Sequence, residues 1–156
     1  ITKMPRVPNL KTQSIRYTRG NFERIFRNNK FDAVFHLARM SHAKAMASSD
    51  MAKRLDLNLM GTSKILELAL RGKVKKNIIV STFHVYGAYP DNPVFLDEES
   101  PLRAAIKYPD LRDVVELDQI CTNWMWKHQN EIETIIFRPS NIIDPKHQYR
   151  AYLGIF

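Results

Sequence analysis

Three stretches of mostly apolar residues predict strands buried in a sheet. They are residues 31–38 (FDAVFHLA), 76–82 (KNIIVST) and 132–140 (IETIIFRPS). Their apolar runs do not alternate regularly with polar residues, which is typical of parallel strands that are covered on both faces. A fourth, alternating stretch at 14–19 (SIRYTR) predicts a further strand, which Gly20 ends.

Helices are predicted between these strands. A short helix covers 21–28, with Asn21 as its N-cap. The stretch 50–71 repeats apolar positions every three or four residues, which gives a helix one buried face, and Gly72 ends it. A third helix is predicted at 109–129, with a proline in its first turn. Its expected buried positions are Val114, Val115, Leu117, Ile120, Cys121 and Trp124.

The alternation of strands and helices predicts a single α/β domain over residues 1–156. Parallel strands joined through helices form an open, doubly wound sheet with right-handed connections. The chain has 156 residues and a mass of 18.2 kDa, as one ordinary domain does. Its hydrophobic content of 44% is that of a globular protein. No apolar run approaches about 18 residues, so no membrane-spanning helix is predicted.

The chain is basic, with 24 Lys and Arg residues against 16 Asp and Glu residues and a formal net charge of +8. The basic residues are scattered and form no stretch interleaved with aromatic residues, so nucleic-acid binding is disfavoured. A basic surface still favours an anionic ligand such as a nucleotide. Because Cys121 is the single cysteine, the chain forms no internal disulfide, which indicates a reducing compartment such as the cytoplasm.

Two hydroxyl residues end the predicted strand 76–82 and mark a candidate ligand site. Ser81 and Thr82 are followed by a turn that contains Tyr86 and Gly87. Open α/β sheets bind their ligands outside the carboxyl ends of the strands. The two hydroxyls are therefore expected where a ligand binds, while Tyr86 and Gly87 are expected to shape the turn.

Metal chemistry and nucleophilic catalysis find no support in the sequence. The five histidines are dispersed, and neither Cys-x-x-Cys nor His-Glu-x-x-His occurs. Cys121 stands among apolar neighbours in the middle of a predicted helix, as a core residue does. No Gly-x-Ser-x-Gly turn is present to carry a nucleophilic serine.

Four stretches in this order carry a family resemblance: FDAVFHLA (31–38), NLMGTSKILELAL (58–70), IIVSTFHVYG (78–87) and IIFRPSNIIDP (135–145). Over about residues 14–145, the chain resembles the NAD(P)-dependent epimerase/dehydratase family, the extended or atypical short-chain dehydrogenases/reductases. The resemblance implies a three-layer Rossmann-like domain that binds NAD or NADP. It further implies a nucleotide sugar or a related small molecule as substrate, and a homodimer is compatible with it.

The resemblance also implies roles for individual residues at the strand ends. Thr82 matches the family's catalytic hydroxyl residue, and Asn58 matches a helical asparagine beside the active site. The other cofactor-binding residues that it implies are His36, Leu37, Ala38, Ser81, Arg138 and Pro139, and the substrate-binding ones are His84, Ser140 and Asn141. For His36, packing at the end of its strand is an equally good interpretation. Arg39 is bulkier than the residue usual in the family after this strand.

The catalytic pair of the family is altered in this chain. The family uses Tyr-x-x-x-Lys on a helix, where positions i and i+4 share a face. The best match is Tyr108 with Arg112, and arginine keeps the positive charge but cannot release a proton. A register two residues later puts Asp110 and Val114 at these positions and leaves no acid–base pair. Two hypotheses follow: a Tyr-assisted NAD(P)-dependent epimerase or dehydratase, and a catalytically impaired nucleotide-binding or regulatory relative.

One family signature is absent, because the chain has 5 glycines and no Gly-x-x-Gly-x-x-Gly. That loop brings backbone N–H groups and a helix N-terminus to a dinucleotide pyrophosphate. In the family it follows the first strand, ahead of everything in this sequence, so that strand, its helix and the second strand are expected to be missing. In the order of the family's sheet, the two missing strands would lie between the strands 14–19 and 31–38. We therefore expect an incomplete view of a longer protein, or a first strand that pairs elsewhere, for instance with a second copy. The 156 residues alone are expected to bind NAD(P) weakly or not at all, and micromolar NAD binding by material of 18.2 kDa would contradict this.

Overall fold

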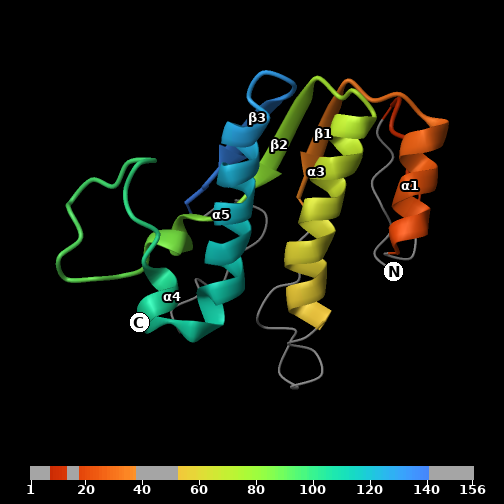
Figure 1. Ribbon diagram of the computed structural model, residues 1–156. Coiled ribbons are helices and arrows are strands. Elements are labelled where there is room, and N and C mark those ends of the chain that lie inside the picture. Colours follow the sequence, from red (N-terminus) through yellow and green to blue (C-terminus); the bar gives the residue numbers. More distant parts are fainter. Residues whose placement is uncertain (1–7, 14–17, 38–52, 141–156) are drawn as a thin grey trace.

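The three apolar stretches pair as parallel strands in the computed structural model, which describes residues 8–13, 18–37 and 53–140 (Figure 1). The strands are β1 (Ala33–His36), β2 (Lys76–Val80) and β3 (Glu133–Phe137), in the order β1-β2-β3. Both pairings are parallel, and they place Phe35 opposite Ile78 and Ile78 opposite Ile135. The predicted Rossmann-like α/β fold, in an incomplete form, is confirmed.

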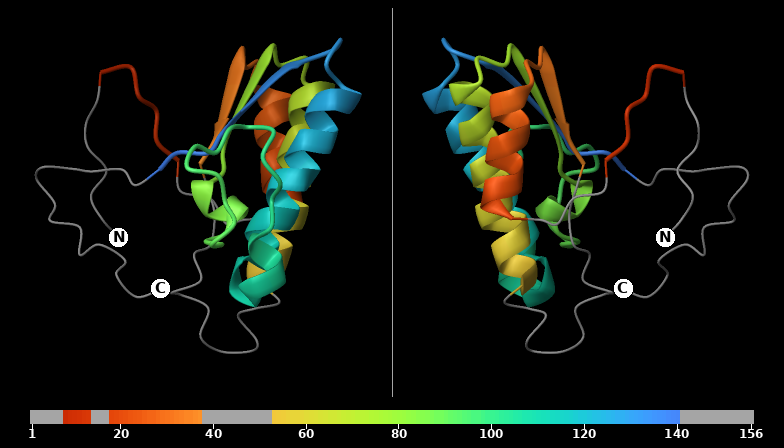
Figure 2. Two further views of the ribbon diagram at one scale, coloured as in Figure 1. Left: turned by 90° about the vertical axis from the view of Figure 1, so that its left-hand side faces the viewer. Right: turned by 90° about the vertical axis from the view of Figure 1, so that its right-hand side faces the viewer.

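Three long helices lie on one face of this sheet (Figure 2). They are α1 (Arg19–Asn28), α3 (Gly61–Arg71) and α5 (Arg112–Lys127). Shorter helical segments are η2 (Asp56–Met60), η3 (Phe83–Tyr86), α4 (Ala104–Lys107) and η4 (Pro109–Leu111). None of the described helices is long and apolar enough to cross a membrane.

The opposite face of the sheet carries no long helix within the described ranges. Along a strand successive side chains point to opposite faces, so Val34 and Ile136 face the helices while Phe35 and Phe137 face away. Phe35 is 66% exposed and Phe137 is 53% exposed. The described part therefore shows two of the three layers that the resemblance implies, and within it β1 pairs along one edge only.

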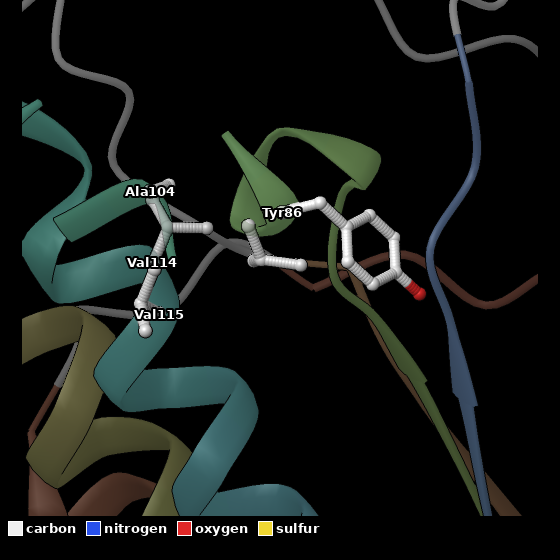
Figure 3. Packing of buried hydrophobic residues seen from close by; sticks show 5 residues of the cluster. Tyr86, Ala104, Val114 and Val115 are labelled. Atoms are coloured by element: carbon white, nitrogen blue, oxygen red, sulfur yellow. The ribbon is translucent and has the colours of Figure 1, made fainter. Parts of the chain in front are cut away.

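Apolar side chains from α3, β2 and α5 form the centre of the core. Leu66, Ile79, Leu117 and Cys121 bury one another between the helices and the sheet. A second cluster contains Ala69, Val74 and Ile132. The third fixes η3 against α4 and α5, and its members are Val85, Tyr86, Ala104, Val114 and Val115 (Figure 3).

The first predicted elements need correction. Helix α1 begins at Arg19 and contains Gly20 and Asn21, so Gly20 does not end a strand there. Thr18, and not Asn21, is the N-cap: it has extended backbone angles and its hydroxyl accepts a hydrogen bond from the Asn21 N–H. Positions 14–17 of the predicted first strand lie outside the described residues.

The other predicted elements are shorter than expected or interrupted. The strand predicted at 31–38 is four residues long and half-exposed, because one of its faces is uncovered. The helix predicted at 50–71 is present from residue 53 onward and contains the wide π turn of η2. The helix predicted at 109–129 is divided into η4 and α5, and two of its expected core residues, Ile120 and Trp124, are only partly buried.

Cys121 is fully buried, which confirms its predicted place in the core. Burial and, to a smaller extent, the nearby Asp118 carboxylate raise the pKa of the Cys121 thiol to about 12. Because the thiolate is the reactive form, we expect Cys121 in the folded protein to be inert toward Ellman's reagent at pH 8. The same assay in concentrated guanidinium chloride should release one equivalent from this cysteine. Fast labelling of Cys121 in the folded protein would contradict its burial.

Candidate functional site

The carboxyl ends of the three parallel strands lie side by side and collect polar groups. His36 ends β1, Ser81 and Thr82 follow β2, and Arg138 follows β3. The Ser81 N–H donates a 2.7 Å hydrogen bond to the Phe137 carbonyl, which extends the pairing of β2 and β3 past their last residues. This edge of the sheet is where the sequence predicted a ligand.

A buried carboxylate on α5 joins the ends of β2 and β3. Asp118 has no exposed surface, and Arg138 grips it with two hydrogen bonds, from Nε at 2.9 Å and from Nη2 at 2.8 Å. The Ser81 hydroxyl donates a third hydrogen bond to Asp118, at 2.6 Å. The paired geometry is the strong, forked form of an Arg–carboxylate contact. The hydrogen bonds to Asp118 are the main reason why the pKa of Arg138 is raised well above its usual value.

The same guanidinium reaches two further segments. Its Nη1 donates to the Tyr86 hydroxyl and to the Glu98 carbonyl, each at 2.9 Å. Figure 3 shows the Tyr86 ring pointing away from Ala104, Val114 and Val115, with its hydroxyl toward the end of β3. Arg138 thus connects β3 to α5, to η3 and to the loop around Glu98, which precedes α4. Cofactor contacts of Ser81 and Arg138 stay predictions, and in the structure both side chains bond within the protein.

Thr82 is positioned by the turn that it starts. It is the N-cap of η3, and its Oγ1 lies 3.2 Å from His84 Nδ1. Val85 anchors η3 in the core, and Gly87 ends it with a φ of 75°. A Cβ on Gly87 would lie 2.6 Å from the Tyr89 ring, so the turn requires glycine there. The hydroxyl of Thr82 therefore has a fixed place beside the sheet edge.

His36 packs against α3. Its Nε2 lies 2.9 Å from the hydroxyl of Thr62, which is fully buried. Burial lowers the pKa of His36, so the imidazole is neutral near pH 7. This contact is the one expected of a packed strand-end histidine, and the cofactor contacts of His36 and Leu37 stay predictions.

Asn58 is buried, and it binds a carboxylate at the start of α5. Its Nδ2 donates a 2.7 Å hydrogen bond to Asp113 Oδ2. Arg54 Nη2 lies 3.1 Å from Asp113 Oδ1, an ion pair without a well-aligned hydrogen bond, and both side chains are 2% exposed. This cluster fastens η2, whose π turn contains Asn58, to the first turn of α5. Single π turns of this kind are frequent at functional sites.

Tyr108 and Arg112 do not share one helix. Tyr108 ends α4 with φ −119° and ψ 85°, and η4 separates it from α5. The premise of i,i+4 neighbours on a continuous helix is therefore wrong. The Tyr108 hydroxyl donates to the Ala88 carbonyl at 3.1 Å, in the loop that follows η3. The Arg112 side chain is 74% exposed and pairs with Glu116 at 3.3 Å.

The remaining predicted site residues lie at the end of β3 or outside the described part. The Pro139 carbonyl accepts a 3.3 Å hydrogen bond from the Phe83 N–H, and Ser140 is exposed. Ala38 and Asn141 are outside the described residues. Within 8–13, 18–37 and 53–140, no group of three or more His, Cys, Asp or Glu residues could hold a metal ion.

The sequence analysis missed the two buried acids, Asp113 and Asp118. A signal for Asp118 was present: it stands four residues after Val114 and three before Cys121, on the predicted buried face of that helix. A carboxylate in such a position needs a cationic partner, because a buried unpaired charge is costly. Arg138, which directly follows β3, is that partner.

Known proteins resemble this chain in sequence and in fold. The family model described as "NAD dependent epimerase/dehydratase family" matches residues 9–153. A UDP-glucose 4-epimerase of Cyamopsis tetragonoloba is 33% identical over 125 residues, 79% of this chain and 33% of that protein. A human dTDP-D-glucose 4,6-dehydratase is 30% identical over 125 residues, 80% of this chain and 33% of that protein.

A solved structure of the UDP-Glc/GlcNAc 4-epimerase from Campylobacter jejuni superposes with a TM-score of 0.63 and 26% identity, over 77% of this chain and 35% of that one. This chain thus spans about a third of the length of the relatives that it matches. The family match covers most of the chain, and the parallel sheet with its polar carboxyl edge agrees with it. The chain belongs to the NAD-dependent epimerase/dehydratase family.

Proposed function

We propose that this chain forms part of an NAD(P)-dependent epimerase or dehydratase that acts on a nucleotide sugar. The observation that carries the proposal is the position of Thr82, whose hydroxyl is fixed by η3 at the carboxyl edge of the sheet. The relatives named above support it, since they are a UDP-glucose 4-epimerase and a dTDP-D-glucose 4,6-dehydratase. Two further solved neighbours contain NAD and NADPH, respectively.

The described residues would provide part of a dinucleotide site. In this proposal the backbone at His36 and Leu37 provides polar groups for the cofactor at the sheet edge, where β1 ends, and the hydroxyl of Thr82 is left for the sugar. No glycine-rich loop occurs in the 156 residues to hold the pyrophosphate, so these residues alone provide an incomplete cofactor site. Bound NAD(P) supplies the hydride acceptor, and the protein's own contribution is to orient the sugar and move a proton.

In this proposal Thr82 orients the reacting oxygen of the sugar, and Tyr108 is its acid–base residue. The Tyr108 phenol lies near the turn after η3, bonded to the Ala88 carbonyl. Arg112 is the positively charged member of the altered pair. Its side chain is exposed to solvent and pairs with Glu116. Substrate contacts of His84, Ser140 and Asn141, a homodimer and a cytoplasmic location belong to the same proposal.

A second function, a catalytically impaired nucleotide-binding relative, is favoured by one observation. The break in the helix at Tyr108–Leu111 separates Tyr108 from Arg112, and the register two residues later places the buried Val114 where a lysine would be. An aliphatic side chain cannot lower the pKa of a phenol or hold a ribose hydroxyl. The two functions share the cofactor and differ in turnover.

Calorimetry and kinetics on the full-length protein separate these functions. We expect saturable binding of NAD or NADP, and turnover of UDP-glucose or dTDP-glucose, which Tyr108→Phe lowers about a hundredfold by removing the acid–base group. The matched control is Tyr89→Phe, which removes a neighbouring phenol bonded to the Arg103 carbonyl and should leave turnover within about twofold.

Three outcomes are informative. A loss in Arg112→Ala as large as that in Tyr108→Phe supports the altered pair. Cofactor binding without turnover of either sugar nucleotide supports the impaired relative. Absence of NAD and NADP binding by the full-length protein contradicts both functions.

A further inference from the structure

His84 touches the one hydroxyl that the proposed reaction uses. The imidazole Nδ1 lies 3.2 Å from Thr82 Oγ1, and the backbone N–H of His84 approaches the same oxygen at 3.4 Å. The Phe83 ring packs edge-on against the imidazole, with ring centres 4.1 Å apart. Since Val85 holds η3 in the core, Thr82 and His84 keep their relative positions.

The hydrogen bond between Nδ1 and Oγ1 uses one hydrogen atom. Whether this hydrogen belongs to His84 or to Thr82 decides whether the Thr82 hydroxyl can donate to a ligand. When Nδ1 carries the hydrogen, the imidazole donates to Oγ1 and the Thr82 hydroxyl hydrogen can point to a ligand oxygen. When Nδ1 is bare, the Thr82 hydroxyl donates to the imidazole and offers a ligand only its lone pairs. The backbone N–H of His84 already occupies part of the accepting side of Oγ1.

We infer that His84 is a positioning residue that sets the direction of the Thr82 hydroxyl through Nδ1. The inference rests on the proposed function in one point, namely that Thr82 contacts the sugar. Donation from Thr82 to a sugar oxygen requires the form of His84 that carries hydrogen on Nδ1. His84 thus acts on the reaction through Thr82, in addition to the substrate contact that the resemblance implied.

Nitrogen-15 NMR of the imidazoles tests the contact without any need for activity. In the full-length protein, Thr82→Val removes the hydroxyl and keeps a branched side chain of nearly the same shape. We expect the Nδ1 resonance of His84 to shift, and the resonances of His128, which is bonded to Glu131 beyond α5, to stay in place. An unchanged Nδ1 resonance in the Thr82→Val protein would overturn the inference.

Two variants of His84 test the role in turnover of UDP-glucose or dTDP-glucose. Asparagine places its amide near the position of Nδ1, whereas glutamine places it near that of Nε2. We expect kcat within about threefold of wild type for His84→Asn and about tenfold lower for His84→Gln, with nearly equal KM, because the lost hydrogen bond acts in the transition state. Equal losses in both variants would contradict a role through Nδ1.

Negative results of the two experiments distinguish the proposed function from the inference about His84. A wild-type protein that turns over no sugar nucleotide refutes the proposed function, and the NMR shift still decides whether His84 orders Thr82. A wild-type protein with turnover but no Nδ1 shift in Thr82→Val refutes only the inference about His84.

Discussion

Asp118→Ala is expected to lower the free energy of unfolding by about 3–5 kcal/mol. The substitution removes the fully buried carboxylate that accepts two hydrogen bonds from Arg138 and one from Ser81. The Arg138 side chain is 14% exposed, so its charge would remain largely buried without its anion. Losing one member of a buried pair costs more than the pair contributes, because the other member is left uncompensated.

Urea unfolding of the full-length protein measures this loss. Trp124 and Trp126 lie on α5 with Asp118 and report the transition of this part by fluorescence. Glu116→Ala is the matched control, because Glu116 pairs with the 74% exposed Arg112 and such pairs contribute about 0.5 kcal/mol or less. Similar midpoints for Asp118→Ala and Glu116→Ala would show that the buried pair does not hold the strand ends.

Asp113→Ala is expected to have an effect of the same size, about 3–5 kcal/mol. Asp113 and Arg54 are each 2% exposed, and Asn58 donates to the same carboxylate. The substitution leaves a guanidinium inside the protein between η2 and α5. Asp113→Asn keeps an oxygen for Asn58 and removes the charge, so it should fall between wild type and Asp113→Ala.

A double variant separates the charge from the packing at this place. Replacing both partners, as Arg54→Met with Asp113→Leu, removes the buried ions together and should recover most of the stability that Asp113→Ala loses. The measurement is again the urea midpoint, at constant slope. A double variant as unstable as Asp113→Ala would show that the cluster acts through shape and not through charge.

The pattern of apolar residues predicted the parallel strands and the helices between them, because burial dictates both periods. It could not predict the length of the strand at 31–38, since the chain around a strand decides which of its faces is covered. It also placed a strand end at Gly20 and the N-cap at Asn21, whereas Thr18 is the N-cap of α1. Local competition between two capping residues is weakly encoded in sequence.

The predicted site residues Ser81, Thr82 and Arg138 lie at the carboxyl edge of the sheet, but the internal contacts of their side chains were not predicted. Thr82 follows from the rule that ligands bind at the carboxyl ends of parallel strands. The contact of Ser81 and Arg138 with Asp118 does not follow from this rule, because Asp118 belongs to a helix far from both residues in sequence. The Tyr108–Arg112 pair came from the family resemblance, whose i,i+4 spacing brings two side chains together only within an unbroken helix.

The β1-β2-β3 order has a consequence for how the protein folds. Every strand pair joins segments separated by a whole helix and its loops, and the described part contains no hairpin that could form by itself. Closing such long loops costs chain entropy before any stabilising contact between the strands has formed. Folding rates fall as contacts become more distant in sequence, so this sheet belongs to the slower class of topologies. Until β2 is seated between its neighbours, the unpaired backbone N–H and C=O groups along the strand edges remain open to pairing with other chains.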